Sequence, residues 1–176
     1  MKMLTLSIFG IALFGLLIGC SDRVSNVEPI AHYDGSKFVL SSQPEGGENV
    51  VAVRESAQDS DEVVIVGRIG GSLNPWVDGR AAFQIVDPSL PACSDEKEDG
   101  EPCSCPTPWD YCCETDKLPN AMALVQFVES DGSVVNHDAR KVFGLKELQT
   151  VIVKGKAKRD DAGNLTIMAQ GMFVRK

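Results

Sequence analysis

The chain has 176 residues, of which 43% are hydrophobic and 24% charged, so it suits one globular domain and is too short to suggest two. Its formal net charge is -8 at pH 7. A surface this acidic repels the phosphates of DNA and RNA, so we expect no nucleic acid among its partners.

The first twenty residues have the pattern of an export signal. A positively charged start around Lys2 precedes an apolar run from Leu4 to Ile18. This run is shorter than the roughly 20 residues that a membrane-spanning helix needs. It ends in Leu17-Ile18-Gly19-Cys20, which resembles the bacterial lipobox. The resemblance implies a lipoprotein signal peptide over residues 1–19, cleavage before Cys20, and lipidation of Cys20 by acyl chains such as palmitate.

Lipidation would make the membrane a partner and place the protein in the bacterial cell envelope. Each buried methylene of an acyl chain contributes about 0.8 kcal/mol, so several chains would anchor it firmly. Ser21 directly follows Cys20. By resemblance to the known sorting rule for lipoproteins, an aspartate at this position would favour retention at the inner membrane. The outer membrane is therefore the expected location. The alternative is an ordinary signal or an uncleaved anchor in which Cys20 has no role.

Residues 20–60 are mostly polar, with two prolines, the Gly46-Gly47 pair and scattered acidic side chains. This composition predicts a flexible tether. For the apolar run from Val50 to Val53, two interpretations stay open: a short strand docked on the edge of the domain, and a solvated linker.

From Asp61 onward, short β-branched runs alternate with turn residues, which is typical of an all-β domain. On the fourth run, three lysines alternate with apolar residues, which predicts one wet face and one buried face. Between the third and fourth runs, residues 139–149 show near-helical spacing and are predicted to form a short helix. The predicted strands cover residues 63–69, 81–86, 122–128, 151–157 and 165–174.

This element order, with the closing phrase VKGKAKRDDAGNLTIMAQGMFV, resembles the OB-fold. The resemblance covers residues 61–176. It implies a β-rich fold with one short helix, arranged as a small five-stranded OB-fold-like Greek-key barrel with a cysteine-rich insertion. Another small barrel or a sandwich is the alternative. Many OB-folds bind single strands through aromatic residues, but here the second and third strands offer only Phe83 and Phe127.

The insertion, residues 88–120, contains five of the six cysteines. A loop of this length inside a compact domain needs a function or a cross-link. In an oxidising compartment, two disulfides with one thiol left over are the leading interpretation, and no cofactor is then expected. Each bridge would contribute on the order of 3 kcal/mol. The cysteines are Cys93, Cys103, Cys105, Cys112 and Cys113.

A metal site is the first alternative, because thiolate ligands need not occur in pairs and an odd number of cysteines is therefore acceptable. Soft thiolates suit zinc or copper(I), and His137 is a possible extra ligand. A thiol-disulfide redox protein is the second alternative, although the acidic surroundings oppose thiolate formation.

Trp109 and Tyr111 offer either a contact face for a partner or a small apolar plug that packs the loop on the barrel.

No Gly-x-Ser-x-Gly elbow, phosphate-binding loop or His-Glu-x-x-His motif occurs in the sequence, so we expect no enzyme. The predicted function is that of an envelope-anchored lipoprotein that acts as a binding or structural module. Its partner would be an unidentified protein or envelope polymer.

Overall fold

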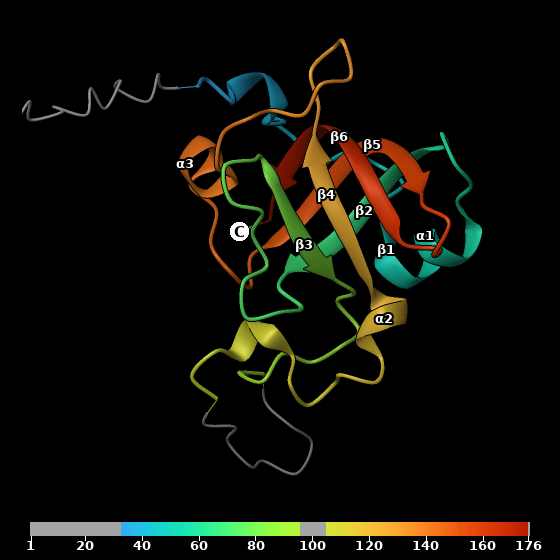
Figure 1. The fold of residues 1–176 in the computed structure, drawn as a ribbon, viewed down its shortest axis with the longest axis vertical. Coiled ribbons are helices and arrows are strands. Elements are labelled where there is room, and N and C mark those ends of the chain that lie inside the picture. The colour runs from blue at the N-terminus through green and yellow to red at the C-terminus, as the bar shows by residue number, and fades with distance from the viewer. Residues whose placement is uncertain (1–32, 96–104, 176) are drawn as a thin grey trace, which may run out of the picture. The chain divides into compact units, whose positions relative to one another are not determined.

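The computed structural model describes residues 33–95 and 105–175, which belong to one compact unit, His32–Lys176. The unit is built on a six-stranded mixed sheet (Figure 1), so the predicted β-rich class is confirmed. All five predicted strands are present, with ends shifted by no more than two residues, and a two-residue strand precedes them. The strands are β1 (Glu48–Asn49), β2 (Glu62–Ile69), β3 (Ala82–Val86), β4 (Met122–Phe127), β5 (Thr150–Arg159) and β6 (Leu165–Val174).

Strands β2 to β6 pair in a ring, which we call the closed sheet. The order is β2-β3-β4-β6-β5, and β5 also pairs with β2. Every contact in the ring is antiparallel except that between β4 and β6, which is parallel. The ladder shifts at Lys154/Gly155, where a Cβ on Gly155 would lie 2.4 Å from the carbonyl oxygen of Met168. Such a bulge bends a strand and helps a sheet to curve.

The core lies inside the closed sheet, because alternate residues of each strand point inward. Phe127 is fully buried and packs against Phe38, Phe83 and Phe143, with ring centroids 4.6 to 6.2 Å apart. On β5, Lys154, Lys156 and Lys158 are exposed while the residues between them are buried, which confirms the predicted wet and buried faces.

The structure differs most from the sequence-based expectation before residue 61. Residues 33–60 are not a flexible tether but pack on the closed sheet, beginning with the 3-10 turn η1 (Ser36–Phe38), whose Phe38 is buried. Residues 20–32 of the expected tether lie outside the described residues. Both interpretations of Val50 to Val53 are wrong, because the run belongs to the helix α1 (Val50–Ser56), with Val50 and Val53 buried.

A carboxylate that is distant in sequence holds the start of α1. Asn49 provides no side-chain cap. Instead, Asp87, which is only 1% exposed, accepts hydrogen bonds from the backbone N–H groups of Val51 (2.7 Å) and Ser89 (2.9 Å). An acidic side chain at this place satisfies helix N–H groups that otherwise have no partner.

The prediction of one short helix is also corrected, because the described residues contain three. Helix α2 (Leu118–Ala121) leads into β4, and α3 (Ala139–Phe143) is shorter than the expected 139–149. Gly144 ends α3 with a left-handed φ of 66°, a conformation that glycine adopts at little cost. Among residues 33–95 and 105–175, no helix has the length and apolar character needed to cross a bilayer.

Candidate metal centre

The cysteine loop, residues 88–120, joins β3 to β4 and is described over residues 88–95 and 105–120. Its described parts lie at the lower end of Figure 1, below β3, and lead into α2. It has a small apolar cluster of its own, so part of the loop is held by packing rather than by sulfur chemistry. The buried members of this cluster are Val86, Leu90, Ala92, Tyr111, Leu118 and Ala121.

Backbone contacts bring the two halves of the cysteine loop together. The N–H of Cys93 donates to the carbonyl of Pro108 (3.2 Å) and joins the two halves. The N–H of Gly71, just after β2, donates to the carbonyl of Trp109 (2.8 Å) and joins the loop to the closed sheet. After the 3-10 turn η2 (Pro108–Asp110), Tyr111 adopts a left-handed φ of 55°. This reversal returns the chain, so that Cys112 faces Cys93.

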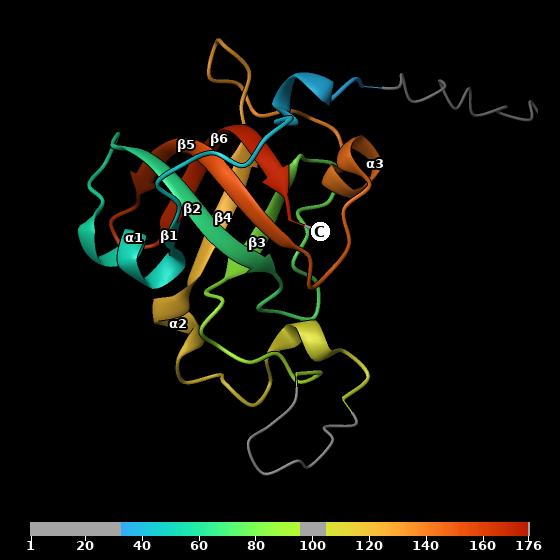
Figure 2. The same ribbon diagram turned by 180° about the vertical axis from the view of Figure 1, so that it is seen from behind.

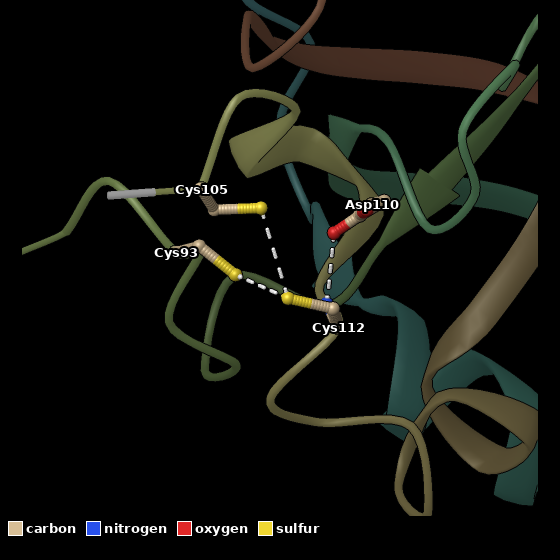
Figure 3. A group of neighbouring side chains, drawn as sticks. All are labelled: Cys93, Cys105, Asp110 and Cys112. Carbon is tan, nitrogen blue, oxygen red and sulfur yellow. Dashed lines mark hydrogen bonds between the residues drawn. The ribbon is translucent and has the colours of Figure 1, made fainter. Parts of the chain in front are cut away.

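Three sulfurs meet at this point, from Cys93, Cys105 and Cys112 (Figure 3). The Sγ atoms of Cys93 and Cys112 are 3.3 Å apart, and those of Cys105 and Cys112 are 3.8 Å apart. The Sγ of Cys113 lies 3.9 Å from that of Cys93. A disulfide needs about 2.05 Å, so none of these pairs is at bonding distance.

The same spacings match the edge of a metal-thiolate tetrahedron. With a Zn–S distance of about 2.3 Å, sulfurs at the corners of a regular tetrahedron lie about 3.8 Å apart. Cys105 and Cys112 have this separation, at 3.8 Å, and Cys93 and Cys112 lie closer together, at 3.3 Å.

A carboxylate completes a set of four donors that we call the candidate centre: Cys93, Cys105, Asp110 and Cys112. One ligand atom from each lies within 4.8 Å of the others. Asp110 accepts hydrogen bonds from the hydroxyl of Thr107 (2.8 Å) and from the N–H of Cys112 (2.9 Å). Such contacts fix the orientation of a ligating carboxylate. No separation exceeds a tetrahedral sulfur–sulfur edge by more than about 1 Å, so only a small contraction around an ion would be needed.

The thiols of the candidate centre differ in acidity. A hydrogen bond from the backbone of Thr107 lowers the pKa of Cys105. Hydrogen bonds to Cys93 and Cys105 raise the pKa of Cys112. Without an ion, Cys105 is therefore the readier of the two to become a thiolate. A bound cation would remove this difference, because coordination deprotonates every ligating thiol.

A salt bridge and a buried ring connect the candidate centre to the closed sheet. The guanidinium of Arg68 on β2 donates two hydrogen bonds, of 2.5 and 3.1 Å, to the carboxylate of Asp95. Asp95 also accepts a hydrogen bond from the N–H of Ala92 (2.8 Å). Tyr111 is fully buried, and its hydroxyl has no hydrogen-bond partner among the described residues. Burial raises the pKa of Tyr111 to about 12.

The other predicted site residues do not join the centre. His137 stacks on Tyr33, with ring centroids 4.9 Å apart, and is not among the grouped ligands. Trp109 is partly buried and donates its indole N–H to the carbonyl of Leu73 (3.2 Å). Tyr111 cannot form an exposed contact face, because it is fully buried as a plug against the closed sheet.

Two predicted residues, Cys20 and Cys103, lie outside the described residues. Asp110 was missed, although its position two residues before Cys112 is the kind of spacing that could have pointed to it. A comparison with protein-family models and with curated proteins finds no match to this chain.

Proposed function

We propose that the chain is a lipid-anchored protein of the bacterial cell envelope whose cysteine loop binds one zinc ion. The ligands are Cys93, Cys105, Cys112 and the carboxylate of Asp110. The observation that carries the proposal is the sulfur spacing of 3.3 to 3.8 Å, which suits a shared ion better than disulfide bonds. The lipobox ending at Cys20 supports the anchor.

The donor set favours zinc over copper(I). Zinc accepts thiolate sulfur and carboxylate oxygen together in a tetrahedral site, whereas copper(I) selects soft sulfur ligands. Asp110 is already oriented toward the three sulfurs by Thr107 and Cys112. All four positions are taken by the protein, as in sites where zinc orders a fold, so the proposed role is structural. The ordered loop would then present a surface to a protein or envelope polymer.

The strand pairing supports an OB-fold as the scaffold. The ring order, the parallel contact between β4 and β6, and the placement of α3 between β4 and β5 suit a five-stranded Greek-key barrel. In this scheme the cysteine loop is an insertion between the second and third strands of the barrel. The acidic net charge argues against nucleic acid as the ligand.

A disulfide between Cys93 and Cys112 is the rival state of the same centre. Their sulfurs are 3.3 Å apart, the shortest of these separations, so a change of about 1.3 Å would join them. Oxidation would remove two thiolates and with them the zinc site. The two states are therefore mutually exclusive, and they can be distinguished by mass and by metal content.

The test uses the mature chain purified from envelopes without chelator and under exclusion of air. We expect one zinc per chain by elemental analysis, no copper, and an intact mass that does not change on reduction. Two bridges without metal would contradict the proposal. Cys112→Ser and Asp110→Asn should lower zinc occupancy, whereas Asp116→Asn, an exposed acidic position in the same loop, is the matched control.

The anchor is tested separately by mass spectrometry of the N-terminal peptide. We expect an acylated peptide that begins at Cys20, and a Cys20→Ala chain that keeps its first nineteen residues. An unmodified Cys20 in the envelope fraction would exclude the anchor and leave the zinc result untouched.

A further inference from the structure

A groove of about 750 Å³ lies on the closed sheet away from the cysteine loop. It runs between η1, the turn after β4 and the outer face of the β5–β6 hairpin. In both views, η1 and the turn after β4 are at the top and the cysteine loop is at the bottom (Figures 1 and 2). We call this groove of about 750 Å³ the lysine groove. Its lining includes Phe38, Val128, Lys156, Ala157, Lys158 and Met168.

The acidic side chains of the lysine groove are already engaged. Glu129 accepts hydrogen bonds from the hydroxyl of Tyr33 and from the ammonium of Lys37, the latter at 2.5 Å. Asp59 accepts from the backbone N–H of Arg159 (3.1 Å) and from the hydroxyl of Ser60 (3.2 Å). Glu129 is thus paired with a cation, whereas Asp59 bonds to neutral donors and leaves one negative charge in the lysine groove.

The two lysines on the outer face of β5 lack such partners. Lys156 and Lys158 are exposed, and no ion pair within 4.0 Å joins either to another described residue. Glu62 is the cross-strand neighbour of Lys156, yet the two do not reach ion-pair distance. Two ammonium groups without an ion pair among the described residues therefore lie beside an apolar floor that includes Phe38 and Met168.

This combination suits an anion that carries an apolar portion. A lysine ammonium binds phosphate as a compact point charge, while the floor can take up a hydrocarbon segment. A phospholipid headgroup with the first part of its acyl chains has both features. Lysines near an anionic bilayer each contribute about 1 kcal/mol to membrane attraction.

The course of the chain favours a membrane source for this phosphate. Tyr33, the first described residue, is hydrogen-bonded to Glu129 on the rim of the lysine groove. Cys20 precedes Tyr33 by thirteen residues, which span at most about 45 Å when fully extended. An anchor at Cys20 would therefore keep the lysine groove close to the bilayer and raise its effective concentration there.

The geometry points to a headgroup site: Lys156 and Lys158 bind the phosphate of an anionic phospholipid in the membrane that holds the anchor. Its membrane source rests on the proposed lipidation of Cys20. The net charge of -8 disfavours contact of the molecule as a whole with an anionic bilayer, so local attraction at the lysine groove has to provide the contact. The protein then stands with the lysine groove toward the membrane and the candidate centre away from it.

The test uses the mature chain from residue 20 onward, made without acyl chains, so that the groove acts alone. Cosedimentation is measured with vesicles of phosphatidylglycerol mixed with phosphatidylcholine, and with phosphatidylcholine alone. We expect binding only to the anionic vesicles, weakened by added salt. Lys156→Glu with Lys158→Glu should weaken it roughly tenfold or more. Lys156→Arg with Lys158→Arg should retain it, which separates loss of charge from loss of folding.

The matched control is Lys141→Glu with Lys146→Glu, two exposed lysines outside the lysine groove that give the same change in net charge. Equal weakening by both double variants would overturn the site. So would binding of soluble glycerol phosphate without any binding to anionic vesicles, since it would assign the groove to a free phosphate ester. Failure of the anchor appears in the mass of the N-terminal peptide, which this assay does not involve.

Discussion

The closed sheet and the cysteine loop are stabilised by different means. The larger apolar cluster, centred on the closed sheet, joins 23 buried residues, whereas that of the cysteine loop joins six. Burial of apolar surface is the main favourable term in folding, so the closed sheet has ample support of its own. The loop adds a salt bridge, a few backbone contacts and a group of sulfurs. The order of the closed sheet thus rests on apolar packing, whereas that of the cysteine loop depends more on its salt bridge and on the state of its sulfurs.

The largest expected effect comes from the core of the closed sheet. Phe127→Ala should lower the free energy of unfolding by about 3 to 5 kcal/mol, because a fully buried ring that touches three others is lost. Urea unfolding followed by circular dichroism measures this. Val77→Ala, at a 36% exposed position, should change stability by less than about 0.5 kcal/mol. Similar losses for both would mean that the core is not where the stability lies.

The proposed zinc site predicts that removing the metal loosens the cysteine loop and leaves the closed sheet intact. The two tryptophans allow a separate reading: Trp76→Phe leaves Trp109 as a reporter of the loop, and Trp109→Phe leaves Trp76, which packs on Phe83, as a reporter of the sheet. In urea with a chelator, the Trp109 fluorescence should change first. Zinc at a hundred times its dissociation constant should restore about 2.7 kcal/mol. Coincident transitions with and without metal would show that the two regions unfold as one.

Asp87 lies where the two regions meet, and its loss should weaken both. Asp87→Asn should cost about 2 kcal/mol, because the buried carboxylate accepts from two backbone N–H groups that an amide oxygen satisfies less well. Differential scanning calorimetry gives the change in melting temperature. Asp78→Asn, whose side chain is 81% exposed, is the control and should have almost no effect.

Acid should weaken the link between Arg68 and Asp95. The hydrogen bond from Arg68 lowers the pKa of Asp95 in the folded state. Its stabilising contribution is therefore complete above the pKa of an unfolded aspartate and is lost as the pH falls through the lowered value. In metal-free protein with Trp76→Phe, Trp109 fluorescence should show the loop loosening over this acidic range. Asp95→Asn should remove that pH dependence, and an unchanged profile would contradict the assignment.

The smallest effect is expected at the hydroxyl of Tyr111. Tyr111→Phe removes a buried polar atom that has no partner among the described residues, so stability should stay within about 1 kcal/mol or rise. Zinc content should not change. A clear loss of stability would mean that the hydroxyl has a partner in solution, such as an ordered water.

Strands β4, β5 and β6 could be predicted because buried and more exposed residues largely alternate along them, whereas β2 and β3 could be predicted as short apolar runs bounded by turn residues. Helix α1 could not, because its valines favour strands and its stability comes from burial and from Asp87, 36 residues away. The early end of α3 could have been predicted from Gly144, a residue that commonly follows the last turn of a helix.

For the site, the sequence identified the cysteines but not their grouping. Which sulfurs meet depends on the turn η2 and on the left-handed backbone of Tyr111, and neither leaves a periodic pattern. His137 was a reasonable ligand by residue type, yet it is engaged with Tyr33, a contact between positions far apart in the chain. Long-range contacts of this kind are set by topology rather than by local composition.

The buried carboxylate of Asp87 also determines how far the protein can be shortened. A chain starting at Asp61 would lose the N–H of Val51, one of the two backbone donors to Asp87, and would uncover the apolar surface that Val50 and Val53 now shield. Exposing apolar surface that the native fold buries lowers stability. The minimal soluble fragment for crystallisation or NMR must therefore keep everything from about Tyr33, even though composition suggests a safe cut nearly thirty residues later.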